Sequence, residues 1–153
     1  MTSAEPIQVA LDSLRHLPMW DAGWAGDIAW FAFGAQVQRP DRRGGQRVVG
    51  EYALHISCPW RWCAVSGFVR ADETSDSAAL HALGQPTTHF VSGGRDSGGP
   101  LILRFGNGDT LEIADPGEPP SSEDEIEYWR LFQPGLQTPH FLVSSTGVEW
   151  HEA

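Results

Sequence analysis

Apolar residues recur every three or four positions at the start of the chain, which is the period of an amphipathic helix. Ser3 can cap such a helix, Glu5 and Pro6 suit its first turn, and Pro18 would end it. The pattern therefore predicts a helix over residues 3–17. Its buried face would hold Ile7, Ala10, Leu11, Leu14 and Leu17.

A short apolar segment and a polar one come next. Residues 27–33, DIAWFAF, are apolar on both faces, which is typical of a buried strand. Residues 34–50 contain Pro40 and the Gly44-Gly45 pair, so we expect a loop there.

The segment YALHISCPWRWC, residues 52–63, alternates between two faces and predicts a half-buried strand. One face holds residues that can all be buried: Tyr52, Leu54, Ile56, Cys58, Trp60 and Trp62. Pro59 cannot donate to a ladder, so the strand should be at an edge or bulged there. A bulge would reverse the alternation beyond it, turning Arg61 inward and Trp60 and Trp62 outward.

Weaker signals follow in the middle of the chain. Short strands are expected at residues 68–70 and 89–91, and a short helix at residues 75–83. Residues 92–100, SGGRDSGGP, have the composition of a loop.

A hairpin is the clearest local prediction. The strands LILRF and DTLEI flank GNG, and a three-residue loop with Gly108 in the left-handed region would pair Phe105 with Asp109. A two-residue turn would instead place Leu103 opposite Glu112, and burial favours the first register. That register gathers Leu101, Leu103, Phe105, Leu111 and Ile113 on one face.

The last part of the chain predicts a helix and a strand. Residues 121–132, SSEDEIEYWRLF, begin with Ser122 and Glu125 at capping-box spacing, and acids suit the first turn of a helix. A final strand is expected over residues 140–144, with a turn before VEW. Together the elements predict one α+β domain over residues 1–153: a mostly antiparallel sheet, with barrel-like closure left open, an N-terminal helix and one further short helix.

The net charge of the chain argues against one class of binding partner. The net charge is −10, from 20 acids and 10 bases, which disfavours nucleic acid binding. Four arginines lie within nine residues of the expected loop: Arg39, Arg42, Arg43 and Arg47. We expect them to be exposed to solvent; the alternative is that they contact a phosphate or an acidic partner. The acidic segment, residues 109–127, holds eight acids and no base: Asp109, Glu112, Asp115, Glu118, Glu123, Asp124, Glu125 and Glu127.

Two binding functions compete on this basis. The first is a non-enzymatic interaction protein, of inhibitor or immunity type, whose acidic segment docks a basic partner with Trp129 and Phe132 as aromatic anchors. The alternative is a sheet or barrel that binds a small ligand. Its pocket would use His55, Arg61, Trp60 and Trp62.

Enzymatic and metal chemistry are less favoured. RDSGGP, residues 95–100, resembles the nucleophile loop of trypsin-like proteases, with His55 and Asp72 preceding Ser97 in the family's order. The similarity ends there, because the histidine context differs and the chain is too short for that fold. For metals, His55 and Cys58 differ by an odd number and face apart on a strand, while Cys63 is out of reach. We expect no metal site, no cofactor and no catalytic residue.

No apolar run approaches the roughly 18 residues that span a bilayer, and no basic region precedes an apolar block at the N-terminus. We therefore expect a cytoplasmic protein without membrane contact, and reduced thiols at both cysteines.

Several scattered blocks carry a family resemblance. GEYALHISCPWRW, preceded by DIAWFAFG and followed by YWRLFQPG and HFLVSSTGVEW, is similar to a group of small uncharacterised bacterial proteins with a Gly-Glu-aromatic-Ala-Leu-His strand leading into Cys-x-Trp-Arg. The resemblance implies a single bacterial domain and transfers no site residue.

Overall fold

The computed structural model describes residues 6–95, 99–114 and 125–152. No helix within these ranges is long and apolar enough to cross a membrane. The helices are α1 (Pro6–Asp12) and α2 (Ser77–Ala82). The strands are β1 (Pro18–Ala25), β2 (Ile28–Pro40), β3 (Gln46–Ile56), β4 (Trp60–Cys63), β5 (Val69–Asp72), β6 (Thr88–Arg95), β7 (Leu101–Phe105), β8 (Thr110–Ile113), β9 (Glu127–Phe132), β10 (His140–Ser144) and β11 (Gly147–His151).

All these strands join one sheet in the order β11-β10-β9-β3-β2-β1-β6-β7-β8-β4-β5. Every strand pair in it is antiparallel. The predicted α+β class, with an N-terminal helix and one further short helix, is confirmed. The sheet does not close into a barrel, because β11 and β5 remain as its two edges.

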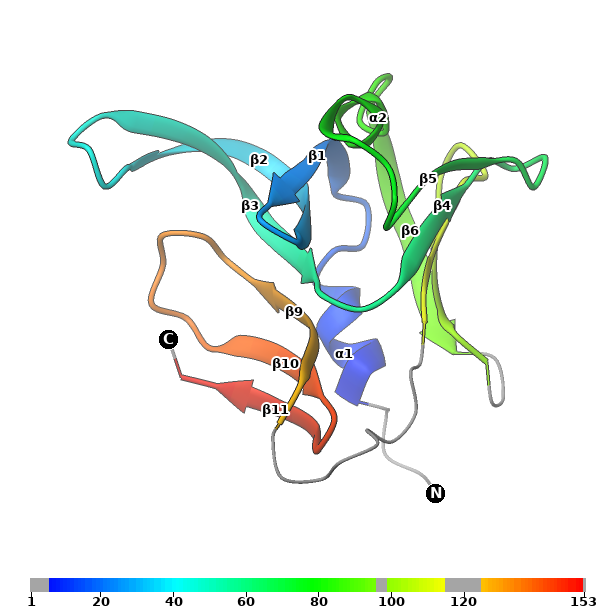
Figure 1. Cartoon of the computed structure of the whole chain (residues 1–153). Helices are drawn as coiled ribbons and strands as arrows, with labels where there is room; N and C mark the ends of the chain where they lie inside the picture. The colour runs from blue at the N-terminus through cyan, green and yellow to red at the C-terminus, as the bar shows by residue number, and fades with distance from the viewer. Residues whose placement is uncertain (1–5, 96–98, 115–124, 153) are drawn as a thin grey trace.

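The core lies on the concave side of this bent sheet. Figure 1 shows α1 inside the bend, between the β9–β11 strands and the β6–β8 strands. The helix buries Ile7, Ala10 and Leu11 against the inward-facing side chains of the strands. The opposite face of the sheet is called the outer face below.

The predicted N-terminal helix is confirmed but shorter than expected. It ends at Asp12, and turns lead to Pro18, which begins β1. The predicted buried residues Leu11 and Leu14 are fully enclosed. Strand β1 was missed because its two tryptophans and two alanines interrupt any regular alternation, and its pairing with β2 has a bulge between Met19 and Asp21.

The loop prediction for residues 34–50 is wrong. Strands β2 and β3 continue through it as a hairpin arm (residues 34–50) that projects from the body of the sheet in Figure 1. The arm leaves the sheet at a bulge where Gly34 has a φ of 86° and the Ala35 amide donates to the Glu51 carboxylate at 3.1 Å. Polar residues occupy both faces of the arm, so its strands leave no alternation in the sequence.

Residues 52–63 form two strands, not the single strand expected. Strand β3 ends at Ile56 and pairs with β2 and β9, whereas β4 starts at Trp60 and pairs with β5 and β8. The crossover contains Pro59 and keeps the alternation, because Trp60 and Trp62 remain buried and Arg61 faces outward. The reversal that a bulge would have caused does not occur.

The helix predicted over residues 121–132 is wrong in its described part. From Glu127 the chain is strand β9, which pairs with β3 on one side and β10 on the other. Trp129 and Leu131 alternate inward, two residues apart, and both are buried. A capping pattern concerns helix ends only, and burial of this pair between two strands outweighs it.

The hairpin prediction is confirmed in its register. Leu103 pairs with Leu111, the Phe105 amide donates to the Asp109 carbonyl at 3.0 Å, and Gly108 has a φ of 92°. The short helix is confirmed as α2, capped by the Asp76 carboxylate. The expected strands at 68–70, 89–91 and 140–144 are present as β5, β6 and β10, although β6 runs on to Arg95 through part of the expected loop.

Candidate functional site

The structure distributes the six predicted binding residues among three places. Trp60, Trp62 and Trp129 are all buried in the core. Phe31 lies edge-on to Trp60 with ring centroids 5.3 Å apart, and Phe105 stacks on Trp62 at 4.4 Å. These three tryptophans pack the concave side and leave little surface for a ligand.

Arg61 lies on the outer face of β4 and forms an ion pair with Glu112 of β8. Strand β4 is separated from β3, which carries His55, by β2, β1, β6, β7 and β8 in the sheet order. His55 and Arg61 line different hollows. The predicted combination of these two side chains is therefore not assembled.

His55 and Phe132 do come together, on the outer face of the neighbouring strands β3 and β9. Their ring centroids are 4.7 Å apart in an edge-to-face arrangement, and His140 stacks on the other side of Phe132 at 4.6 Å. Arg130 contacts Nδ1 of His140 at 2.9 Å and pairs with Glu127 at 2.5 Å. The result is a compact group of rings and charges on one patch of the sheet.

The protonation of His55 follows from this setting. Burial, with a further contribution from the positive charge of Arg130, lowers the pKa of His55 from 6.5 to about 4. The pKa of His140 is lowered for the same two reasons, burial first. His55 is therefore uncharged at neutral pH and presents an aromatic ring with one donor and one acceptor.

The outer groove is a hollow of about 310 Å³ beside His55, formed where β1, β2, β3 and β9 present their outer faces. Its main lining residues are Trp20, Trp30, Ala32, Ala53, His55 and Phe132. The register orders them along the strands, with Trp30 opposite His55 and Ala32 opposite Ala53. Arg47 of the arm and Pro134, just after β9, lie beyond them and form the far end. Small floor residues between large aromatic walls produce the hollow.

Trp20 supplies the unusual polar group of the outer groove. Its Nε1 atom is buried and has no hydrogen-bond partner within the described residues. An indole N–H donor that is buried without an acceptor costs about 1–3 kcal/mol, so such donors normally have a partner. Trp20 itself lines the hollow, together with mostly apolar residues and with the polar side chains of Asp21, His55 and Arg47.

The sequence contained one signal for this site. DIAWFAF is apolar on both faces, and we assigned both faces to burial. In the structure Phe31 and Phe33 enter the core, while Trp30 and Ala32 line the outer groove. Both helices are short and α1 lies on the concave side, so neither described helix covers the outer apolar face at the groove. Trp20 was not found, because β1 had not been predicted. Arg47 was named in the arginine cluster, but as a residue of an expected loop and not of this site.

A larger hollow of about 630 Å³ lies between the end of β3 and the start of α2, and it is less enclosed. Several of its polar groups serve the fold. The Asp76 carboxylate accepts from the Ala79 amide at 2.9 Å, and Nε1 of Trp24 donates to the Ser75 carbonyl at 2.9 Å. The outer groove combines better enclosure with an unused donor, so we select it as the candidate site.

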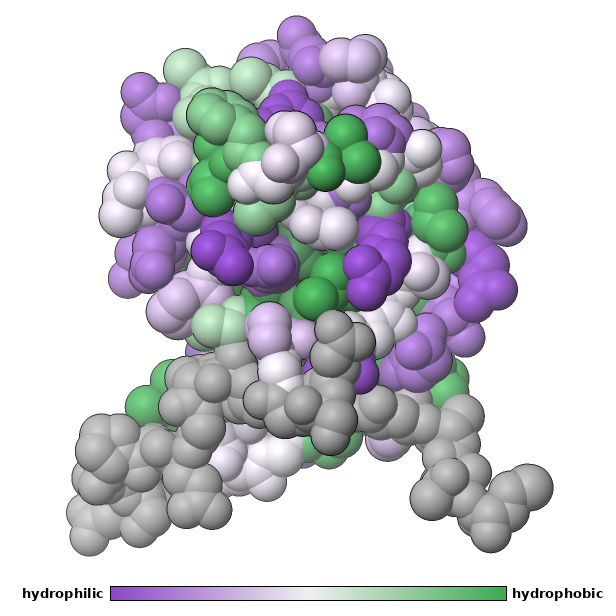
Figure 2. Space-filling model, turned by 90° about the vertical axis from the view of Figure 1, so that its right-hand side faces the viewer, coloured by the Kyte–Doolittle hydropathy of each residue, from purple (hydrophilic) through white to green (hydrophobic). Residues whose placement is uncertain are grey.

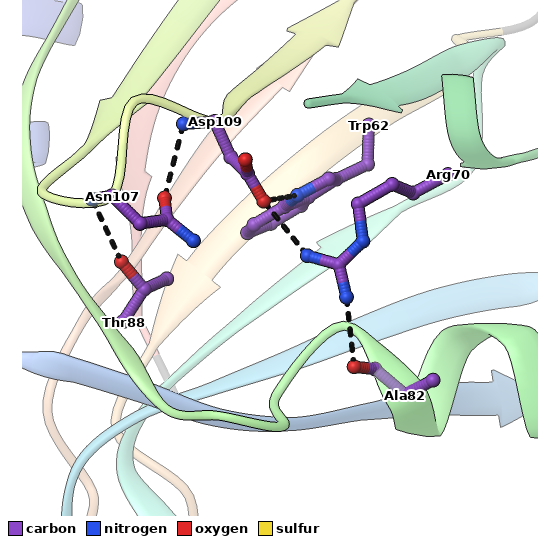
Figure 3. A network of polar contacts seen from close by, with 6 residues as sticks. All are labelled: Trp62, Arg70, Ala82, Thr88, Asn107 and Asp109. Atoms are coloured by element: carbon purple, nitrogen blue, oxygen red, sulfur yellow. Dashed lines mark hydrogen bonds and ion pairs between the residues drawn. The ribbon is translucent and has the colours of Figure 1, made fainter. Parts of the chain in front are cut away.

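The polar network in Figure 3 is structural. The Asp109 carboxylate accepts from Nε1 of Trp62 at 2.9 Å and from Arg70 at 2.7 Å, and Arg70 also donates to the Ala82 carbonyl at 3.0 Å. Asn107 orders the hairpin loop by accepting from the Asp109 amide at 3.0 Å. These contacts tie the β7–β8 hairpin to β4, β5 and α2.

The structure does not assemble the other chemistry considered above. Within the described residues no three His, Cys, Asp or Glu side chains gather to hold a metal ion, and the two cysteines are buried and not joined in a disulfide. His55 contacts Phe132, whereas the Asp72 carboxylate accepts from Thr74. Ser97, the third residue of the protease-like order, lies outside the described residues.

The described acids of the acidic segment all have partners. Asp109 pairs with Arg70, Glu112 with Arg61 and Glu127 with Arg130, while Glu125 accepts from the hydroxyls of Ser144 and Thr146. The other four lie outside the described residues: Asp115, Glu118, Glu123 and Asp124. Charge in the described part of the segment is therefore largely compensated.

On the side of the molecule that carries β4 and β5, the exposed apolar residues among those described are scattered. Val65 and Phe68, in the turn between these strands, are 77% and 69% exposed. Figure 2 shows this side, where hydrophobic residues form small groups separated by hydrophilic ones. Isolated exposed apolar residues are normal on protein surfaces.

Comparison of the chain with protein-family models, curated protein sequences and solved structures gave no match. The resemblance to a group of bacterial proteins stays a prediction. The candidate site rests on its own geometry.

Proposed function

We propose that the protein is a non-catalytic binding protein that holds a small, largely apolar ligand in the outer groove. The observation that carries this proposal is an enclosed aromatic hollow lined by Trp20, whose buried N–H lacks a partner among the described residues. A ligand with an acceptor at this point would satisfy the donor. The aromatic walls would stack on its rings.

The size and composition of the outer groove support a small molecule. Its volume of about 310 Å³ lies at the lower end of ligand pockets, which are mostly apolar with a few placed polar groups. His55 adds a second polar contact without adding charge, because its pKa is about 4. The neighbouring ring of Phe132 restricts the position of the imidazole.

The test is the binding of N-phenyl-1-naphthylamine, an uncharged dye whose fluorescence rises in apolar surroundings. Ala53→Leu fills the floor of the outer groove and should abolish binding. Ala78→Leu makes the same change at an exposed position of α2 and should leave binding unchanged. The proposal fails if the wild type does not bind the dye, or if both variants bind it equally.

Docking of a basic protein partner by the acidic segment is a second proposal, supported by the net charge of −10. It ranks below the first because its described carboxylates already have partners within the chain. A pull-down from the native cell at low salt should recover one specific basic protein that is released at high salt. Recovery of no specific partner would refute it.

A further inference from the structure

Two arginines meet at the arm end of the outer groove. Arg39 and Arg47 are directly opposite each other across β2 and β3. Arg47 lines the outer groove, and Nε of Arg39 donates to the carbonyl of Pro134, which lines it as well. The two arginines therefore lie on the same side of the arm, at the same end of the hollow.

These two positive charges are not neutralised by the described part of the chain, in which neither arginine forms an ion pair. Two acids share a hollow with Arg47, and each has other partners. Asp21 lines the outer groove and pairs with His81 at 2.6 Å, while Asp41 lines the neighbouring hollow at the arm tip and accepts from backbone amides there. Like charges directly opposite each other on adjacent strands are destabilising. An anion bound between them would remove that cost.

We infer that the ligand of the outer groove is an amphipathic anion: an aromatic or apolar body with one carboxylate or sulfonate group. The inference rests on the proposed function and adds the charge of the ligand. The body would lie between Trp20, Trp30 and Phe132, and the anionic group would lie at Arg39 and Arg47. Arginine is suited to this role, because its planar fork can bind an oxyanion through two parallel hydrogen bonds.

The arrangement favours a small anion over a polyanion such as nucleic acid. The uncompensated cations lie at the end of an apolar hollow and on a short arm, while the whole chain carries a net charge of −10. A nucleic acid would need an extended basic surface, and the surrounding negative charge would repel it. A ligand with an apolar body and one anionic group fits both parts of the site, because the body can fill the hollow and the anionic group can lie at the two arginines.

Two dyes with the same ring system test the inference. 8-Anilinonaphthalene-1-sulfonate carries a sulfonate, and N-phenyl-1-naphthylamine lacks it. The sulfonate dye should bind at least about tenfold more tightly, because hydrogen bonds to a charged group contribute on that scale. Arg47→Gln and Arg39→Gln should each remove most of this difference and leave the affinity for the uncharged dye unchanged.

Arg43→Gln is the matched control, since Arg43 lies on the same arm but does not line the outer groove. If this variant weakens the sulfonate dye as much as Arg47→Gln does, general attraction to the arm accounts for binding and the inference is overturned. It is also overturned if the wild type binds both dyes equally, although the proposed function would then stand. If neither dye binds, both fall.

A second measurement does not depend on a ligand. Removal of one of two opposed charges should leave the unliganded protein as stable as the wild type or more stable, and should reduce the gain in stability on adding salt. Thermal unfolding of Arg47→Gln at low and high salt tests this. A marked loss of stability would mean that Arg47 already has a stabilising partner in the fold, contrary to the inference.

Discussion

Asp109 provides the sharpest stability prediction, because several parts of the fold meet at its carboxylate. The side chain is 6% exposed and accepts from both Trp62 and Arg70. Asp109→Ala removes the Oδ2 atom that accepts both hydrogen bonds. It leaves the indole N–H of Trp62 buried, because the rest of that side chain is enclosed in the core.

The magnitude follows from the two lost interactions. Breaking a buried ion pair by removing one partner costs about 3–5 kcal/mol, since the other charge is left uncompensated. Arg70 is 25% exposed and keeps its bond to the Ala82 carbonyl, so water can recover part of that cost. With the orphaned indole donor adding about 1–2 kcal/mol, we expect Asp109→Ala to lower the free energy of unfolding by about 3–4 kcal/mol. Asp109→Asn retains an acceptor and should lose about half as much.

Equilibrium unfolding in urea, followed by tryptophan fluorescence and circular dichroism, measures these differences. Glu112→Gln is the control, because it breaks the solvent-exposed pair between this hairpin and Arg61 of β4 and should lower the free energy of unfolding far less than Asp109→Ala does. If Asp109→Ala costs no more than Glu112→Gln, the network does not support the fold as argued.

Three further outcomes are expected. Between about pH 6.5 and 4, His55 is protonated in the unfolded chain but not in the folded protein. The free energy of unfolding should therefore fall as the pH is lowered through this window, by about 1–2 kcal/mol after allowing for partial exposure of the ring. His55→Gln should flatten this part of the plot of stability against pH. Trp20→Phe removes the unpaired N–H donor, so a ligand that carries an acceptor, identified by screening, should bind about tenfold more weakly. Unchanged affinity would mean that this donor takes no part in binding. In Gly108→Ala the new residue has to adopt a φ of 92°, and its Cβ lies 2.8 Å from the side chain of Val65, so the free energy of unfolding should fall by about 2 kcal/mol. In Gly26→Ala φ is 64° and no atom lies within 4 Å of the new Cβ, so the fall should be smaller.

Local patterns in the sequence were enough wherever neighbouring residues decide the structure. The register of the β7–β8 hairpin followed from GNG and from burying Leu103 with Leu111. Helix α2 followed from the short helical window at residues 75–83. The inward face of residues 52–62 followed from alternation alone, since burial repeats every second residue on either side of the crossover.

The conformations of β9 and of the arm depend on strand pairing between distant parts of the chain, which local sequence patterns do not show. Strand β9 has acids that suit a helix start, yet it pairs between β3 and β10, and burial of Trp129 and Leu131 outweighs the local preference. The arm is extended without a buried face of its own. Its strands are therefore held by the pairing of β2 with β3 and leave no hydrophobic period.

The candidate site was likewise decided by the tertiary structure. Of its residues, the sequence identified His55 and Phe132 but grouped them with Arg61 and with tryptophans that belong to the core. Their neighbours come from several strands: Trp20 from β1, Trp30 and Ala32 from β2, and Arg47 from the arm end of β3, the strand that also carries His55. The amino-acid sequence alone determined which faces of the strands could be buried. Only the order of strands in the sheet decided that one apolar face remained uncovered, with a buried donor and two cations beside it.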